Sequence, residues 1–164
     1  MTTGSAVLAP FYAGWDVYQQ HLVEAVAPLS SEQLALRAAP HLFSVGILAA
    51  HIVATRAGWL YYTLEERDER LPALAAWNDP DLPALPSVAA LVSGLQTTWE
   101  VIQAGLARWT VADMTARFRD VDDNGEEHFY TRQWVIWHLI EHDMHHGGEL
   151  SFTLGMHHVP AIDL

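Results

Sequence analysis

The sequence predicts an all-α protein, a four-helix bundle with a short hairpin before its last helix. Four long stretches repeat apolar side chains at spacings of three and four residues, which is the period of one face of an α-helix. Prolines or cap-forming serines and threonines bound these stretches. The chain has 164 residues, of which 51% are hydrophobic and 17% charged, so we expect a single domain spanning residues 1–164.

The first long helix is predicted to begin at Pro10 and to end near Pro28. A proline fits the first turn of a helix, where its missing N–H is not needed. The side chains that share the apolar face of this helix are Phe11, Trp15, Tyr18, Leu22 and Ala25.

A short helix and the second long helix follow. Ser30 and Gln33 have the spacing of a capping box, which predicts a short helix that Pro40 ends. Ser44 is a suitable N-cap for a long helix that we expect to reach about Asp68.

Residues 69–86 contain four prolines, too many for a helix interior, and are predicted to form an irregular surface connection. Ser87 then caps the third long helix, whose apolar residues keep the helical period as far as Trp109. This segment has the most regular pattern in the chain.

The last part of the chain is predicted to hold a hairpin and the fourth long helix. Asn124-Gly125 tolerates the positive φ angles of a tight turn, so we expect an exposed hairpin within residues 117–130. Thr131 is the predicted cap of the last helix, and Gly155 leads into an irregular tail.

The charged residues exclude several functions. Eight basic residues, all arginine, oppose 20 acidic ones, and the resulting charge of −12 would repel phosphate backbones and anionic membranes. We therefore predict no nucleic-acid partner and no membrane partner. The absence of cysteine excludes disulfides and an internal thiol nucleophile, and the absence of lysine excludes a Schiff base.

The sequence does not show the pattern of a signal peptide or of a membrane-spanning segment. The first ten residues carry no basic group and no sustained apolar run, unlike a signal peptide. The apolar run around His51 soon reaches Arg56 and is too short to span a bilayer. We therefore expect a cytoplasmic protein.

Histidine is the residue that points to chemistry, because it is the commonest metal ligand. His138, His142 and His146 lie at positions i, i+4 and i+8 of the last helix. Neighbours four apart can share one divalent ion, but the outer two are separated by ~12 Å of helix rise, so either the first pair or the second must be chosen. His51 lies among apolar residues on the expected inner face of the second long helix and is the natural third ligand.

Each of these histidines also has an alternative interpretation. An isolated histidine on an apolar face is more often a hydrogen-bonded core residue than a ligand, and His51 could be one. The histidine-rich stripe of the last helix could be a solvated surface. The coincidence of the two features favours a metal site.

Two segments resemble the DinB-like, YfiT-like superfamily of metal-binding four-helix bundles. They are LSSEQLALRAAPHLFSVGILAAHIVATRAGWL (residues 29–60) and WHLIEHDMHHGGELSFTLGMHHVPAIDL (residues 137–164). The resemblance implies that His51, His142 and His146 are the metal ligands and that His138 lies beside them. Many members have His-Arg-Gly-Gln where this chain has His-Gly-Gly-Glu at residues 146–149, so a positive group is lost and a carboxylate is gained.

Three histidine ligands leave coordination positions open, as in a catalytic site. Zinc is the first expectation for the ion, with nickel or iron as alternatives. Glu149, His138 and His145 are the candidate catalytic residues, because each can exchange a proton near the ion.

The resemblance implies a small-molecule enzyme that pairs as a homodimer. Characterised relatives activate a low-molecular-weight thiol for attack on an electrophile, in detoxification or stress response, so a thiol-S-transferase-like activity is expected. The thiol would be external, because the chain has no cysteine. The alternatives are a metal-dependent hydrolase that activates water and a non-catalytic metal-binding or structural bundle.

Overall fold

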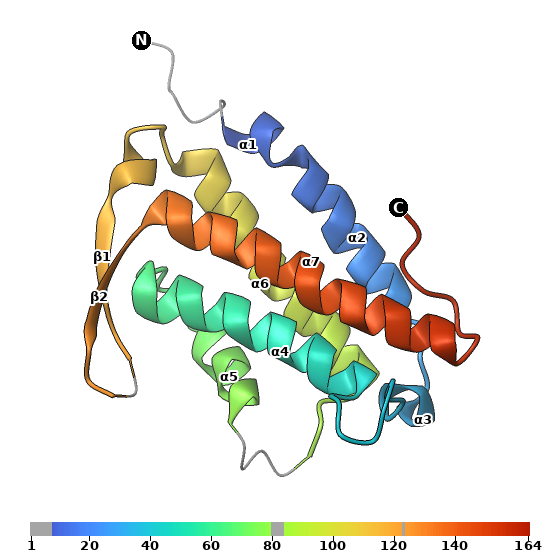
Figure 1. Ribbon diagram of the computed structural model, residues 1–164. Helices are drawn as coiled ribbons and strands as arrows, with labels where there is room; N and C mark the ends of the chain where they lie inside the picture. Colours follow the sequence, from blue (N-terminus) through green and yellow to red (C-terminus); the bar gives the residue numbers. More distant parts are fainter. Residues whose placement is uncertain (1–7, 80–83, 123) are drawn as a thin grey trace.

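The computed structural model describes residues 8–79, 84–122 and 124–164. Its four long helices form a bundle in which α4 and α7 lie side by side, with α6 behind them and α2 along the other flank of α7 (Figure 1). The all-α bundle with a hairpin is confirmed. The long helices are α2 (Ala13–Val26), α4 (Val45–Gly58), α6 (Val88–Arg108) and α7 (Arg132–Met156).

Shorter elements connect the long helices. The helical ones are α1 (Leu8–Phe11), α3 (Ser31–Leu34), the π-helical turn η2 (Trp59–Thr63), α5 (Leu71–Ala75) and the 3-10 turns η3 (Ala76–Asn78) and η4 (Asp113–Thr115). The two strands of the hairpin are β1 (Arg117–Val121) and β2 (Glu127–Thr131).

The predicted helix caps are confirmed. The side chains of Ser44, Ser87 and Thr131 each accept a hydrogen bond from a backbone N–H in the first turn of the helix that follows. Ser30 and Gln33 form the reciprocal capping box of α3. Each cap satisfies a backbone N–H that has no partner within the helix, so these helices begin where the sequence indicates.

The second long helix is shorter than expected. It does not reach Asp68, because its last turn widens into η2, in which the N–H of Leu64 bonds to the carbonyl of Trp59 at 2.9 Å. Glu65 then adopts a positive φ of 57°, which a continuing right-handed helix does not allow. The chain therefore leaves the helix at Leu64.

The connection after this helix is more regular than predicted. It contains α5 and η3, and Pro72 stands in the first turn of α5, where a proline is tolerated. Part of the predicted connection, residues 80–83, lies outside the described residues. Because α5 and η3 pack against α4, they bring the side chain of Asn78 to the middle of that helix.

The hairpin is present, but its turn is wider than a two-residue turn. β1 and β2 pair antiparallel, with Phe118 opposite Tyr130, and the strands end at residues 121 and 127. Gly125 has the positive φ expected of it, 81°. The carboxylate of Asp122 accepts the backbone N–H groups of residues 124 and 126, which stabilises the longer turn.

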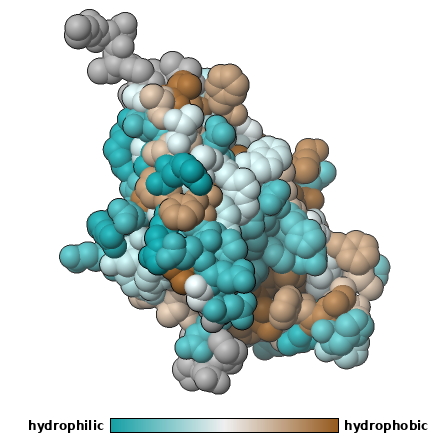
Figure 2. All heavy atoms as spheres, turned by 60° about the vertical axis from the view of Figure 1, so that its left-hand side comes forward, coloured by the Kyte–Doolittle hydropathy of each residue, from teal (hydrophilic) through white to brown (hydrophobic). Residues whose placement is uncertain are grey.

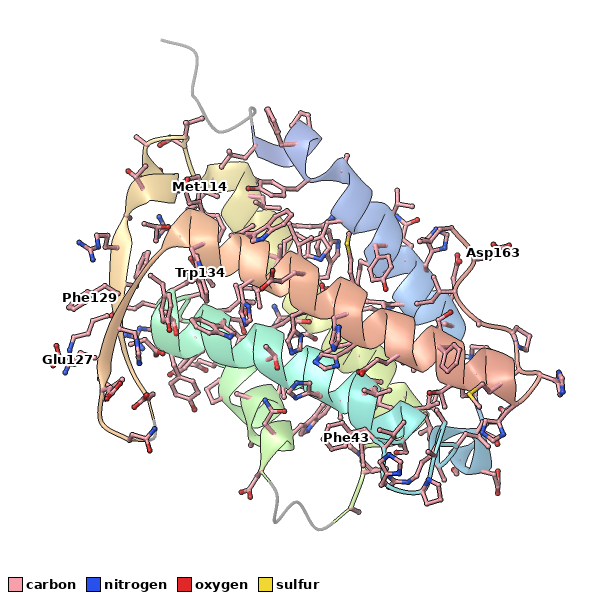
Figure 3. All side chains as sticks on the ribbon, in the orientation of Figure 1. Phe43, Met114, Glu127, Phe129, Trp134 and Asp163 are labelled. Carbon is pink, nitrogen blue, oxygen red and sulfur yellow. The ribbon has the colours of Figure 1, made fainter. Side chains whose placement is uncertain are left out.

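Most of the surface at the hairpin end of the bundle is hydrophilic, with smaller hydrophobic areas towards the lower right (Figure 2). Exposed aromatic side chains are also found, among them Phe43 just before α4 and Trp134 in the first turn of α7 (Figure 3). No helix in the described part of the chain combines the length and the apolar character needed to cross a membrane.

Candidate metal centre

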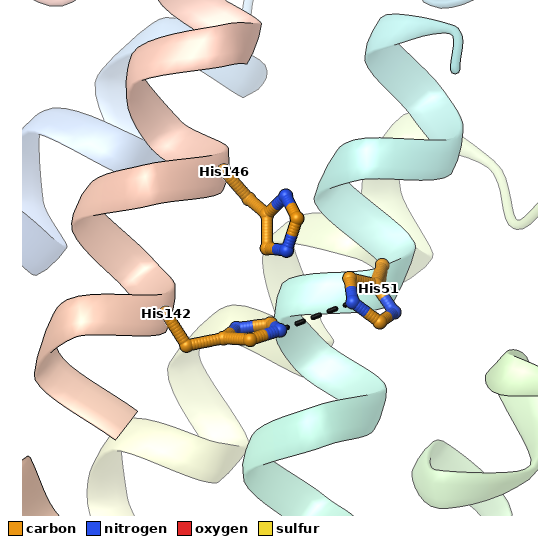
Figure 4. A group of neighbouring side chains, drawn as sticks. All are labelled: His51, His142 and His146. Atoms are coloured by element: carbon orange, nitrogen blue, oxygen red, sulfur yellow. Dashed lines mark hydrogen bonds between the residues drawn. The ribbon is translucent and has the colours of Figure 1, made fainter. Parts of the chain in front are cut away.

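Three histidines meet where α4 and α7 pack side by side (Figure 4). His51 comes from the middle of α4, and His142 and His146 come from successive turns of α7. One ligand atom from each residue lies within 4.8 Å of the other two, and the Nε2 atoms of His51 and His142 are 3.0 Å apart. We refer to these three residues as the His triad.

Two members of the His triad are held by hydrogen bonds on the far side of the ring. Nδ1 of His51 lies 2.8 Å from Oδ1 of Asn78, and Nδ1 of His146 lies 2.8 Å from Oε2 of Glu149. Because carboxylate and amide oxygens accept hydrogen bonds, these contacts favour the tautomer with the hydrogen on Nδ1 and the lone pair on Nε2. Histidine ligands of metals usually have such a partner on the other ring nitrogen.

The environment of His142 acts strongly on its imidazole. Burial, with smaller contributions from His146 and His51, lowers its pKa from 6.5 to about 3, and its Nδ1 is buried without a hydrogen-bond partner. Burial also lowers the pKa of His146, although the hydrogen bond that His146 donates to Glu149 acts in the opposite direction. Both imidazoles are therefore neutral near pH 7, which is the form that binds metal ions.

The donor set fits a divalent transition-metal ion. Two nitrogens bound to one tetrahedral zinc ion are about 3.3 Å apart, and the closest pair in the His triad is already at 3.0 Å. Neutral imidazoles suit zinc, nickel and iron(II) alike. Three protein ligands also leave room in the coordination sphere for a substrate atom.

The structure shows which histidines of the last helix lie beside His51. His142 and His146 form one group of possible ligands with His51, and His138 is not part of this group. His51 itself is not on the inner face of the bundle as expected, since it is half-buried at the boundary between α4 and α7. The next residue, Ile52, is fully buried and faces the core. α4 packs against α5, α6 and α7.

The three candidate catalytic residues occupy different places. Glu149 contacts His146 directly. His138 lies one turn before His142, with ring centroids 5.9 Å apart, and its own ring stacks on Trp134. His145 is 67% exposed on the flank of α7, 3.7 Å from the carboxylate of Glu149.

Sequence reasoning did not identify Asn78 as part of the site. The residue lies in the proline-rich connection that was predicted to be irregular, and it reaches His51 only because α5 and η3 fold against α4. An asparagine in a segment without helical period carries no signal of such a contact. Its partner could not have been found without the tertiary structure.

Two cavities lie near the His triad. One, of about 580 Å³, opens beside His51 and is otherwise lined mainly by apolar side chains. These include Phe43, Ile47, Trp77 and Leu85, while Asp79 adds a carboxylate. A smaller cavity, of about 200 Å³, is lined by Glu149 together with the apolar residues Leu48 and Phe152. The larger cavity therefore places a space for a small molecule directly beside His51.

Two further groups of possible ligands occur among the described residues, but they are less suited to hold an ion. His145 and Glu149 form one with His146, which already belongs to the His triad. Asp122, Glu126 and His128 form the other in the hairpin, where the carboxylate of Asp122 is occupied by backbone N–H groups.

A helical bundle with three imidazoles that meet between two of its helices defines a class of candidate metal-binding proteins. The chain belongs to the DinB superfamily, whose family model matches residues 15–150. A crystal structure of a DinB-like protein from Bacillus cereus ATCC 10987 is similar to this fold. Its TM-score is 0.67 over 94% of this chain and 95% of that chain, at 20% sequence identity.

This likeness concerns the fold alone, because the identity is low. A search of curated proteins finds no match to the chain. Membership of the superfamily and the geometry of the His triad are together compatible with a metal-binding protein.

Proposed function

We propose that the protein is a metal-dependent enzyme that activates a low-molecular-weight thiol for attack on an electrophile. His51, His142 and His146 would hold one divalent transition-metal ion, with zinc as the first candidate. The observation that carries this proposal is the tautomer pattern of the His triad. Asn78 and Glu149 are bonded to Nδ1 of His51 and of His146, and Nε2 of His51 lies 3.0 Å from Nε2 of His142.

The ion would supply one chemical effect, which is to lower the pKa of a thiol so that the thiolate predominates near neutral pH. Glu149 and Asn78 keep the ring orientations that a ligand needs. His138 is held by its stack on Trp134 and by Glu141, 3.1 Å from its Nδ1. Its Nε2 is thus left to accept the proton that the thiol loses.

Hydrolysis is the second candidate, and one observation favours it. Glu149 is 47% exposed beside the His triad, where many relatives have glutamine, and a carboxylate there can accept a proton from water. The same residue is compatible with the thiol reaction, so the two activities must be separated by experiment.

The test is a pair of assays on protein that has been stripped of metal and reloaded with zinc, nickel or iron(II). One assay follows consumption of a thiol with a chromogenic aryl halide, and the other follows hydrolysis of a chromogenic ester. We expect metal-dependent thiol transfer that is lost in His51→Ala and kept in the control His21→Ala, which alters a histidine of α2. Ester hydrolysis without thiol transfer would support the hydrolase, and stoichiometric metal with neither activity would support a non-catalytic bundle.

A further inference from the structure

We propose that His145, His146 and Glu149 form an exposed capture site, at which a divalent metal ion binds before it passes to the His triad. The inference rests on the metal-binding part of the proposed function and does not depend on the thiol reaction. Four features carry it: the spacing of the ligand atoms, the exposure of the three side chains, the ring that both sets share, and the charge of the surrounding surface.

The ligand atoms of the capture site have nearly the spacing that one ion requires. One ligand atom from each of the three residues lies within 4.8 Å of the other two. Nδ1 of His146 is 2.8 Å from one carboxylate oxygen of Glu149, and Nε2 of His145 is 3.7 Å from the other. Ligand atoms on one tetrahedral zinc ion are about 3.3 Å apart, which lies between these two distances. Two imidazoles and a carboxylate are also a donor set that zinc takes in proteins.

The exposure of the side chains falls from the capture site towards the His triad. The side chain of His145 is 67% exposed, that of Glu149 is 47% exposed, and that of His146 is 16% exposed. The ring of His146 in turn lies beside the other two rings of the His triad, with centroids 4.7 Å from His51 and 4.4 Å from His142. A hydrated ion can therefore bind first at the surface and exchange its waters for protein ligands one after another.

The ring of His146 belongs to both sets of ligands, and a neutral imidazole offers a lone pair at only one of its nitrogens. An ion in the capture site takes Nδ1, which faces Glu149, and the ring hydrogen is then on Nε2. An ion in the His triad takes Nε2, and the hydrogen returns to Nδ1, where Glu149 accepts it. The two sites therefore exclude each other, so the capture site is a step in loading and not a second permanent site.

The surface around the capture site attracts cations. Glu141 and Glu149 lie four residues before and four residues after His145, on the same side of α7. Both carboxylates are about half exposed, and the chain as a whole has a charge of −12. Such a surface raises the local concentration of divalent ions. The cavity beside His51, in contrast, is lined mainly by apolar side chains, which offer an ion no ligand.

The test follows the uptake of cobalt(II) by full-length, metal-free protein in a stopped-flow instrument. Cobalt(II) quenches tryptophan fluorescence, and Trp59 and Trp134 both contact His138, one turn from His142. We expect the uptake rate of the wild type to level off at high cobalt concentration, as the capture site fills. In His145→Ala, uptake should be about tenfold slower and should rise linearly with cobalt concentration. Release into excess chelator should slow by the same factor, because the affinity of the His triad does not change.

The control is His21→Ala, which removes a histidine that lies 3.7 Å from Glu24 on α2, and it should leave both rates unchanged. Glu149→Gln should also slow uptake, but it should weaken affinity as well, because Glu149 orients His146. Uptake at the wild-type rate in His145→Ala would overturn the inference and indicate entry through the cavity beside His51. Slower uptake with unchanged release would overturn it too, because His145 would then act on the final complex. A wild type that binds no cobalt would overturn both the capture site and the His triad.

Discussion

Arg56 of α4 and Asp143 of α7 form an ion pair that solvent does not reach. Nη2 of the arginine lies 2.6 Å from Oδ2 of the aspartate, and both side chains are 0% exposed. Two residues of α2 complete the network, since Gln19 accepts from Arg56 at 2.7 Å and Trp15 donates to Asp143 at 2.6 Å. The network joins three helices at the level of the His triad, because His142 immediately precedes Asp143.

Removing one partner of this ion pair should be strongly destabilising. Asp143→Asn leaves the guanidinium of Arg56 buried without a counter-charge, and we expect a loss of about 3–5 kcal/mol in the free energy of unfolding, measured by urea denaturation. The control is Arg119→Ala, which breaks an exposed pair with Glu127 and should change stability by less than about 1 kcal/mol. A loss of similar size in both variants would contradict the role assigned to the buried network.

The two adjacent glycines of α7 should respond oppositely to alanine. A Cβ at Gly147 would collide with the hydroxyl of Tyr18 and approach Leu22 to 3.1 Å, whereas a Cβ at Gly148 meets nothing within 4 Å. Gly147→Ala should therefore cost about 1–3 kcal/mol through overpacking against α2. Gly148→Ala should raise stability by up to about 1 kcal/mol, because alanine favours a helix interior.

Thermal denaturation of these two variants and the wild type makes the comparison. The same direction of change in both would mean that α2 does not pack on α7 as described. The contacts of the two positions also show that only Gly147 is required by the close approach of a neighbouring helix.

The long helices could be predicted because their signals are local. The caps at Ser44, Ser87 and Thr131 and the apolar period that follows each of them need no knowledge of the rest of the chain. α5 was missed because prolines dominate its segment, although Pro72 stands at the one place where a helix tolerates it. The end of α4 was placed too late because nothing in the sequence marks the positive φ of Glu65.

The site could be predicted only in part, because only some of its signals are local in the sequence. The spacing of His142 and His146 is a local feature, and the resemblance to a family separated this pair from the one that includes His138. The ion pair of Arg56 and Asp143 joins residues 87 positions apart, and a charged residue in an otherwise apolar helix does not reveal its partner. Asp143 lies fully buried against Arg56, and nothing in the sequence around it marks this contact.

Acid should destabilise the metal-free protein through His142. Its pKa is about 3 in the folded chain and near 6.5 when unfolded, so between these values the unfolded chain binds a proton that the folded chain does not. The free energy of unfolding therefore falls as the pH is lowered from 6.5 towards 3, by at most about 1.4 kcal/mol per pH unit for this proton. The lowered pKa of His146 acts in the same direction.

Urea denaturation of chelator-treated protein between pH 7 and pH 5 measures this slope. Lowered carboxylate pKa values contribute little in that range, and His142→Asn should show a shallower slope than the wild type. Identical slopes would mean that His142 is not held as a neutral, buried imidazole.

Asn78 should affect metal affinity without being a ligand. Asn78→Ala removes the acceptor at Nδ1 of His51, which lets the ring rotate and change tautomer, and we expect affinity to fall by about 10- to 100-fold. Competition with a chromogenic chelator gives the dissociation constant. Gln20→Ala, which removes an exposed amide of α2, is the control, and an unchanged affinity in Asn78→Ala would exclude this role.

The central claim is that His51, His142 and His146 bind one metal ion, and elemental analysis of untagged protein tests it most directly. Wild type, His51→Ala, His146→Ala and the control His21→Ala are compared after the same purification and the same supply of zinc or nickel. We predict about one transition-metal ion per chain in the wild type and the control, and none in the other two variants. A wild type that binds no metal, or a His51→Ala or His146→Ala variant that keeps a full equivalent, would contradict the account.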